Sequence, residues 1–138
     1  MHLPLFLFKR DSTNKGSTTW TWNSSNWFIV SAPNDPILML TRDLHFQYWK
    51  DYDYCMHYFI FHMFFKMSAD VYNHEWERVP FVSRNLPLEM HYSMYEDYTE
   101  EKMNHFREIS DFHKLTYKLN PEHMPSDKSI YHHVVYDE

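Results

Sequence analysis

Residues 32–50 read APNDPILMLTRDLHFQYWK, and this stretch decides how the rest of the chain is interpreted. Asp35 can cap a helix by accepting a backbone N–H bond, and Pro36 suits the first helical position because its missing N–H is not needed there. After these two residues, apolar side chains recur on one helical face while charged side chains lie away from it. The spacing therefore predicts an amphipathic helix over 37–50. Its apolar face comprises Ile37, Leu40, Leu44 and Tyr48.

Two short strands and a second helix are predicted on either side of this stretch. Residues 3–8 form an apolar run, and residues 26–31 are rich in aromatic and β-branched side chains, so both are predicted to be strands. Residues 54–71 are apolar on nearly every side, which is typical of a helix buried at the centre of a fold. In this prediction, Phe59 and Met63 contact the apolar face of the first helix.

Two further helical signals follow. Residues 73–78 predict one turn of helix. Asp97, with Glu100 three residues later, matches a capping box and predicts a helix that carries Met103 and Phe106 on its apolar side.

The remaining segments give weaker patterns. Residues 87–95 are ambiguous, and residues 110–119 favour a loop that leads into a brief strand or helical turn. Residues 130–136 could form an edge strand. The whole pattern indicates a helix-rich α+β fold with a few short strands. We expect a single lobe over 1–138, in which 120–138 is a polar tail.

Composition excludes several classes of protein. The net charge of −6 argues against a broad nucleic-acid surface, which needs clustered Lys and Arg. Cys55 is the only cysteine, so no internal disulfide can form and a reducing compartment fits best. The most apolar stretch, over 55–67, is too short and too polar to cross a bilayer, and the N-terminus does not resemble a secretory signal. These features predict a soluble cytosolic chain without a transmembrane segment.

Glycine is scarce. Gly16 is the only one, whereas average usage near 7% predicts roughly ten in a chain of this length. Nucleotide-binding α/β domains use glycine where the backbone approaches phosphates, because glycine lacks the Cβ that blocks the approach. Either the fold is mostly helical, or a phosphate-binding part lies outside this chain.

Eleven histidines suggest a metal site, but their spacing argues against most arrangements. His57 and His62 are five residues apart, or about 140° around a helix, whereas two zinc ligands on a helix share a face. His74 begins a segment like HExxH, with Arg78 where the second ligand would stand. The adjacent residues at 132 and 133 would point apart on a strand. A dedicated zinc site is therefore disfavoured.

Asp51-Tyr52-Asp53 is a DxD sequence, which can hold a divalent cation that bridges the diphosphate of a sugar nucleotide. In enzymes that use this motif, it ends a strand in a tight loop. Here it ends a predicted amphipathic helix. The position favours solvated loop residues over a metal site.

Several residues suit polar ligands. Tryptophans in a Ser/Thr/Asn-rich context suit sugar binding, because the C–H face of a pyranose packs on aromatic rings while its hydroxyls find hydrogen bonds; they could equally be partly buried anchors of a loop. A cluster of potential cations near Thr116 could meet a phosphate or form an exposed turn. The tryptophans are Trp20, Trp22 and Trp27, of which Trp27 is the substrate-binding candidate, and the cations are His113, Lys114 and Lys118.

The order of four blocks is more informative than any single motif. They read NWFIVSAPNDPILMLTRDLHFQYWK (26–50), HYFIFHMFFKM (57–67), EWERVPFVS (75–83) and REISDFHKLTYKL (107–119). In order and spacing they resemble the C-terminal half of the capsular polysaccharide synthesis proteins. These are bacterial glycosyltransferases related to a DxD-bearing, mannosyltransferase-like group.

The resemblance implies the C-terminal lobe of a GT-A fold, whose Rossmann-like first half binds the nucleotide sugar and Mn²⁺ or Mg²⁺ through DxD. In full-length members that motif lies upstream of the N-W-F block. We therefore expect this chain to lack the donor-binding half, to bind no cation alone and to be inactive alone. By the same resemblance, His113 is a candidate metal ligand, and Lys114 and Lys118 are candidate phosphate contacts.

One block departs from the family pattern. The family's D-Y-F-L-F-H reads His57-Tyr58-Phe59-Ile60-Phe61-His62 here, so histidine replaces the acid while the last histidine is retained. Histidine can act as a base near neutral pH, which makes His57 and His62 the catalytic candidates.

The resemblance implies transfer of a sugar from a nucleotide donor to a capsular or other surface polysaccharide, in the cytoplasm at the inner membrane face. The nucleotide sugar and the polysaccharide acceptor are the implied partners. The alternative is a non-catalytic carbohydrate- or protein-interaction module, and a His-rich metal-binding protein ranks last. We also expect self-association, in which the apolar run over 3–8 offers an unpaired strand edge.

Overall fold

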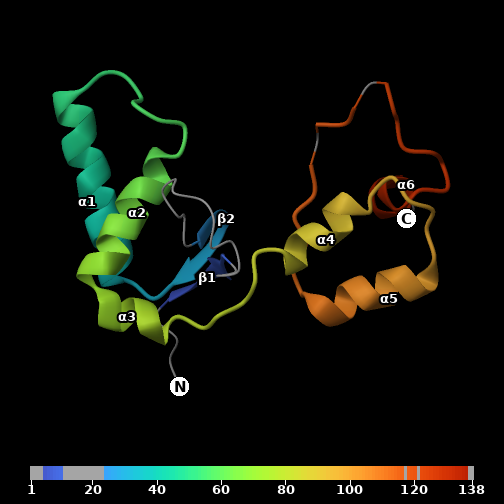
Figure 1. Ribbon diagram of the computed structural model, residues 1–138, viewed down its shortest axis with the longest axis horizontal. Coiled ribbons are helices and arrows are strands. Elements are labelled where there is room, and N and C mark those ends of the chain that lie inside the picture. The colour runs from blue at the N-terminus through green and yellow to red at the C-terminus, as the bar shows by residue number, and fades with distance from the viewer. Residues whose placement is uncertain (1–4, 11–23, 117, 121, 137–138) are drawn as a thin grey trace, which may run out of the picture. The chain divides into compact units, whose positions relative to one another are not determined.

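The computed structural model describes residues 5–10, 24–116, 118–120 and 122–136 (Figure 1). Over these residues it is a helix-rich α+β fold, as predicted. The chain divides into two compact units, Met1–Arg84 and Asn85–Glu138. One lobe can contain two compact units, so the single lobe over 1–138 stays a prediction. The elements are β1 (Leu5–Lys9), β2 (Ser24–Ser31), α1 (Pro36–Asp51), α2 (Ile60–Val71), α3 (Asn73–Arg78), α4 (Leu86–Tyr92), α5 (Glu100–Ile109) and α6 (Ile130–Tyr136).

Both predicted strands form, and they pair with each other. β1 runs antiparallel to β2, with Leu5 opposite Ser31 and Leu7 opposite Ile29, and the register is irregular between Leu7 and Lys9. Leu5 and Leu7 are buried. β1 is therefore not an unpaired strand as expected, because one edge bonds to β2 and its apolar side chains enter the core, whereas the expected self-association stays a prediction.

α1 begins where the sequence predicts. Asp35 accepts a hydrogen bond from the Leu38 N–H at 3.0 Å, and Pro36 occupies the first turn. Asn34, just before the cap, adopts φ 62°, a left-handed conformation that asparagine tolerates better than most residues. Asn34 and the cap residue Asp35 turn the chain from β2 into the helix.

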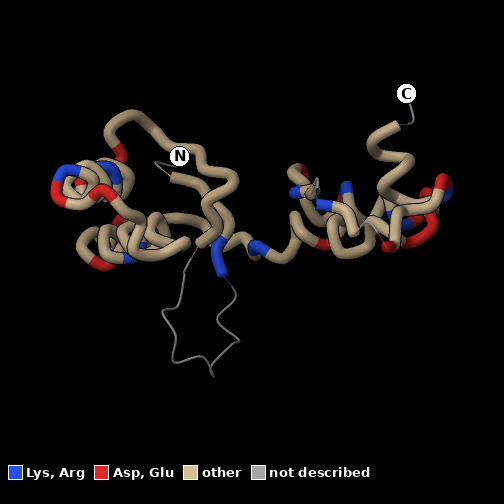
Figure 2. The backbone as a smooth tube through the Cα atoms, turned by 90° about the horizontal axis from the view of Figure 1, so that it is seen from above, with Lys and Arg blue, Asp and Glu red and all other residues tan. Residues whose placement is uncertain are grey.

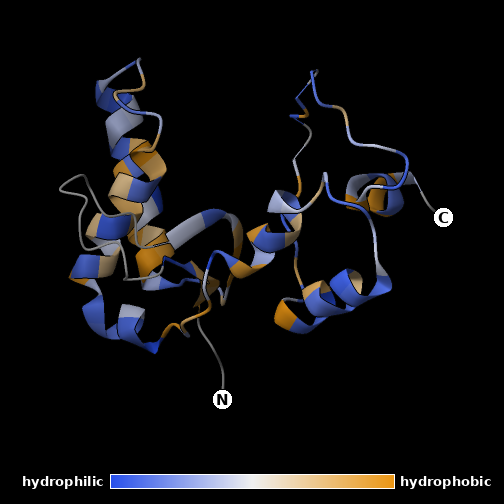
Figure 3. Ribbon diagram, turned by 45° about the vertical axis from the view of Figure 1, so that its right-hand side comes forward, coloured by the Kyte–Doolittle hydropathy of each residue, from blue (hydrophilic) through white to orange (hydrophobic). Residues whose placement is uncertain are grey.

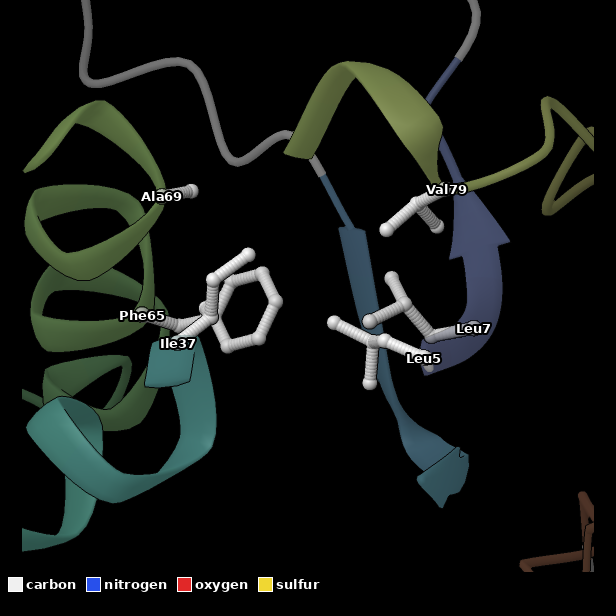
Figure 4. Close-up of a cluster of buried hydrophobic side chains, with 6 residues drawn as sticks. All are labelled: Leu5, Leu7, Ile37, Phe65, Ala69 and Val79. Atoms are coloured by element: carbon white, nitrogen blue, oxygen red, sulfur yellow. The ribbon is translucent and has the colours of Figure 1, made fainter. Parts of the chain in front are cut away.

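The packing between α1 and α2 combines apolar and polar contacts. Thr41 is buried on α1, and its hydroxyl donates to the Ile37 carbonyl at 2.8 Å and contacts the Ser68 hydroxyl at 3.0 Å. Ser68 in turn donates to the Phe64 carbonyl, so the buried hydroxyls are satisfied. Apolar residues dominate α2 (Figure 3). The core between these helices and β1 consists of Leu5, Leu7, Ile37, Phe65, Ala69 and Val79 (Figure 4).

The prediction of a helix over 54–71 is wrong in its first part, because α2 begins at Ile60. The Tyr48 hydroxyl donates to the Tyr54 carbonyl at 2.6 Å and accepts from the Met56 N–H at 3.0 Å. These backbone groups are thus engaged by α1 and cannot enter a helical ladder. Phe59 is 38% exposed, so its predicted core position is also wrong.

α2 is buried on one face only. Phe64, Phe65, Ser68 and Ala69 are buried, whereas Met67 and Val71 are exposed. The prediction of a helix that is covered on nearly every side is therefore wrong. A continuous apolar run of this length does not specify which face of the helix is buried. The packing of the neighbouring elements determines that face.

The second unit is built from three short helices. α5 carries the predicted buried residues Met103 and Phe106. Its cap is Thr99, whose side chain accepts from the Lys102 N–H at 3.3 Å, so the predicted capping box at Asp97 is wrong. Asp97 is instead in a bridge with Ser129. The core of this unit consists of Met90, Met103, Phe106 and Ile130.

The edge strand predicted over 130–136 is also wrong, because these residues form α6. The Ser129 hydroxyl accepts from the His132 N–H at 3.1 Å, which caps the helix. The Ile130 and Tyr131 N–H groups donate to the carbonyls of Glu96 and Met94, both at 2.9 Å. The first N–H groups of the helix thus find acceptors, and these contacts outweigh the strand preference of β-branched residues.

Candidate functional site

The segment after α3 is held against the end of β1. The Lys9 N–H donates to the Val82 carbonyl and the Arg84 N–H donates to the Lys9 carbonyl, both at 2.8 Å. The Lys9 ammonium donates to the Val79 and Trp76 carbonyls at 2.7 and 3.2 Å, and lies 4.1 Å from the Trp76 ring centroid. Burial lowers the pKa of Lys9. These bonds fix the backbone at Arg84, which is half-buried.

The residues before α2 form a turn around His57. Its Nδ1 accepts from the Phe59 N–H at 3.0 Å, and its carbonyl accepts from the Ile60 N–H at 3.1 Å. An aspartate at this position could accept the same bond from the N–H two residues on. His57 is exposed, and its ring lies 5.7 Å from that of Phe59.

His62 lies in the first turn of α2 and is half-buried. Its ring is 5.7 Å from the ring of Phe59, so Phe59 is near both histidines predicted to be catalytic. Burial, and then the positive charge of Arg84, lower the pKa of His62. The lowered pKa favours the neutral imidazole, which is the form that can accept a proton.

Trp27 lies on β2 and is half-buried. Its ring stacks on that of Phe8, with centroids 5.3 Å apart and an interplanar angle of 8°. Its Nε1 is buried and has no hydrogen-bond partner among the described residues. One face of the ring is thus covered by the protein, and the role of Trp27 in substrate binding stays a prediction. Trp20 and Trp22 lie outside the described residues.

The other predicted site residues lie in the second unit. The His113 ring packs edge-on against Phe106, with centroids 6.3 Å apart, and its buried Nδ1 has no hydrogen-bond partner in the part of the chain that the structure describes. The Lys114 N–H donates to the Pro87 carbonyl at 2.8 Å, and the side chains of Lys114 and Lys118 are exposed. Their phosphate-binding role stays a prediction.

The DxD sequence lies where α1 ends and the next loop begins. Both Asp51 and Asp53 are exposed, and Asp51 accepts from the Gln47 amide at 2.8 Å. These are the solvated positions that the sequence favours for the DxD. The described residues contain no group of three His, Cys, Asp or Glu side chains placed to hold a metal ion. His113 would supply at most one ligand of such a cation, and its role as a metal ligand stays a prediction.

Charged side chains of both signs lie elsewhere on the described residues. Lysines and arginines lie near acidic residues on several helices (Figure 2), and some form surface pairs, such as Lys66–Asp70 at 2.6 Å and Lys102–Glu96 at 3.0 Å. Against this background, the positive charge of Arg84 beside His62 stands out, since it acts on a half-buried group.

A model of the family described as "Capsular polysaccharide synthesis protein" matches residues 2–134. The chain belongs to this family. No curated protein and no solved structure matches it. Membership indicates that this capsular polysaccharide synthesis protein takes part in capsular polysaccharide synthesis. The match is longer than the stretch of the four blocks over 26–119, and it covers most of both units.

Two site features of this family member could not be found from its sequence. The charge of Arg84 acts on His62, and the backbone at Arg84 is held by a bond to Lys9, a residue far away in the sequence. The role of His57 in the turn before α2 was also missed, although an acid at that position in the family pattern is itself a signal for a cap.

In the described ranges of the chain, no helix is long and apolar enough to span a membrane.

Proposed function

We propose that this chain is part of a glycosyltransferase that moves a sugar from a nucleotide donor to a capsular or other surface polysaccharide, and that it is inactive alone. Family membership supports a capsular polysaccharide as the product, and the resemblance to DxD-bearing transferases supports sugar transfer as the reaction. The GT-A architecture and the use of Mn²⁺ or Mg²⁺ by full-length members stay predictions.

The observation that carries the proposal is half-buried His62 in the first turn of α2, whose pKa is lowered by burial and then by the positive charge of Arg84. Sugar transfer to a hydroxyl requires a base that takes the hydroxyl proton, and a base with a pKa near or below neutrality is available at pH 7. The departing nucleotide diphosphate gains negative charge, and a fixed guanidinium stabilises such charge through paired hydrogen bonds. In this proposal, His62 is the base and Arg84 faces the diphosphate.

His57 takes a different part. Its Nδ1 already accepts the Phe59 N–H, so it positions the start of α2, and with it His62, rather than taking a proton itself. The replacement of the family's acid by histidine at this position is then compatible with activity, because both side chains offer an acceptor to the same N–H.

The scarcity of glycine supports inactivity alone. Gly16 is the single glycine, and the sequence contains no Gly-rich turn of the kind that lets the backbone approach a diphosphate. Purified chain with Mn²⁺ and a panel of nucleotide sugars should therefore release no nucleotide. Metal-dependent release above the rate of a blank would overturn this part of the proposal.

The functional part is tested in the source organism. Deletion of the coding sequence should lower the amount of surface polysaccharide, and reintroduction of the unaltered gene should restore it. His62→Ala should fail to restore it, whereas His74→Ala should succeed, because His74 is a fully exposed histidine of the same unit. Full restoration by His62→Ala, with normal protein levels, would exclude His62 as the base and favour the non-catalytic module.

A further inference from the structure

Three large aromatic side chains are exposed in the last turn of α1 and in the loop that follows it. Trp49, Tyr52 and Tyr54 are 47%, 48% and 59% exposed. They are joined through the buried Tyr48, whose ring lies 5.0 Å from both Trp49 and Tyr52, and Tyr52 lies 5.8 Å from Tyr54. We refer to Trp49, Tyr52 and Tyr54 as the aromatic platform.

The platform is held in place from beneath. The Tyr48 hydroxyl bonds the backbone at Tyr54 and Met56, at 2.6 and 3.0 Å, and the Tyr48 ring packs in a buried cluster with Ile60 and Phe64. The loop that follows α1 is therefore tied to the helix core at two points. A surface fixed in this way loses little conformational freedom when a ligand binds, so contacts on it translate more fully into affinity.

Carboxylates accompany the rings. Asp51 and Asp53 are exposed and alternate in sequence with Tyr52 and Tyr54. An aromatic face carries partial negative charge that attracts C–H groups, and an ionised carboxylate only accepts hydrogen bonds. A pyranose offers both complements, since one face presents C–H groups and its rim presents hydroxyl donors.

We infer that the aromatic platform binds an uncharged pyranose chain, the acceptor glycan of the sugar transfer; this rests on the proposed function. Charge selects this occupant. The exposed charged residues between these rings are Lys50, Asp51 and Asp53, so carboxylates outnumber cations there. This excess and the net charge of −6 disfavour a polyanionic glycan and an anionic bilayer, both of which need excess Lys and Arg. A second copy would face the same surface across a two-fold axis, which brings like carboxylates together.

The test uses the purified full chain with maltohexaose, cellohexaose and mannohexaose as neutral probes, followed by calorimetric or NMR titration. At least one probe should bind saturably, and Trp49→Ala and Tyr54→Ala should each weaken binding by about three- to tenfold, the range expected for one aromatic contact. Tyr92→Ala is the matched control, because Tyr92 is a 68% exposed tyrosine outside the platform, and it should leave binding unchanged.

Tyr48→Phe serves as a second variant, since it keeps the ring and removes the hydroxyl that fixes the loop. It should weaken binding while far-UV circular dichroism stays native. No saturable binding of any neutral probe, or equal binding by Trp49→Ala and Tyr54→Ala, would overturn the inference. So would platform-dependent binding to anionic vesicles, or a platform-dependent dimer in sedimentation, in place of glycan binding.

The outcome is separable from that of the proposed function. His62→Ala lies outside the platform and should leave glycan binding intact while it abolishes polysaccharide production. If the platform fails and His62 remains essential in cells, the transferase proposal stands and the acceptor binds elsewhere. If glycan binding holds while His62→Ala restores the polymer, the platform stands and only the catalytic proposal is lost.

Discussion

The two units of the chain build their cores in different ways. In the first unit, residues from Leu5 to Val79 meet between a two-stranded sheet and two long helices, and several of them are fully buried. In the second unit, the core joins Met90, Phe106 and Ile130 from three short helices. The difference indicates that the first unit derives its stability from tight packing between a sheet and long helices, whereas the second depends on a smaller core between short helices.

The largest effect is expected at Phe65, which is completely buried in the first core. Phe65→Ala should lower the free energy of unfolding by about 3–5 kcal/mol, because it removes a large ring and leaves a cavity that a tightly packed core cannot close. Urea unfolding followed by circular dichroism measures this. Met67→Ala is the control on the exposed side of the same helix and should have little effect. A loss below about 0.5 kcal/mol for Phe65→Ala would break the comparison, because it would fall within the range of surface substitutions.

The equivalent change in the second unit should cost less. Ile130 is buried at the start of α6, and Ile130→Ala should cost about 2–3 kcal/mol, in the lower part of the usual range, because short helices can close around the cavity. Hydrogen exchange of the α5 amides measures this loss of stability in the second unit. Val135→Ala, at an exposed β-branched residue of α6, is the control. A cost for Ile130→Ala above that of Phe65→Ala would reverse the comparison.

Helix caps provide a finer test. Asp35→Ala should cost about 1 kcal/mol, because it leaves a backbone N–H of α1 without its acceptor. Thr99→Ala should cost less, since its bond to the Lys102 N–H is longer, 3.3 Å against 3.0 Å. Asp35→Asn retains an acceptor and should be nearly neutral. If Thr99→Ala proves costlier than Asp35→Ala, α5 depends on its cap more strongly than its geometry indicates.

Local signals predicted part of this fold well. The start of α1 was readable because Asp35 and Pro36 act on adjacent backbone groups. The start of α2 and the identity of α6 were not, because they depend on bonds from Tyr48 to residues 54 and 56, and from residues 94 and 96 to α6. An apolar or β-branched run does not show which distant groups will form hydrogen bonds with its backbone N–H and carbonyl groups.

The candidate site was predictable to a similar degree. His57 and His62 were singled out from one block, and the structure brings both against Phe59. Arg84 was missed because its proximity to His62 depends on a backbone bridge between Lys9 and Ser83. His113, Lys114 and Lys118 lie together in a segment of the second unit, and no local pattern shows what they bind.

The smallest expected effect is a loss of stability of the first unit at acidic pH. Burial lowers the pKa of both His45 and His62, and both lie in the first unit. The unfolded chain then binds protons more readily than the folded one, so this contribution to stability is complete above the unfolded pKa of about 6.5 and is lost as pH falls toward the folded values. Hydrogen exchange between pH 7 and pH 5, corrected for the intrinsic rate, should show protection falling in α1 and α2. His62→Gln should reduce that fall, whereas His74→Gln, at a fully exposed histidine, should leave it unchanged. An identical pH dependence in His62→Gln and the unaltered chain would mean that His62 does not contribute to the acid sensitivity of the first unit.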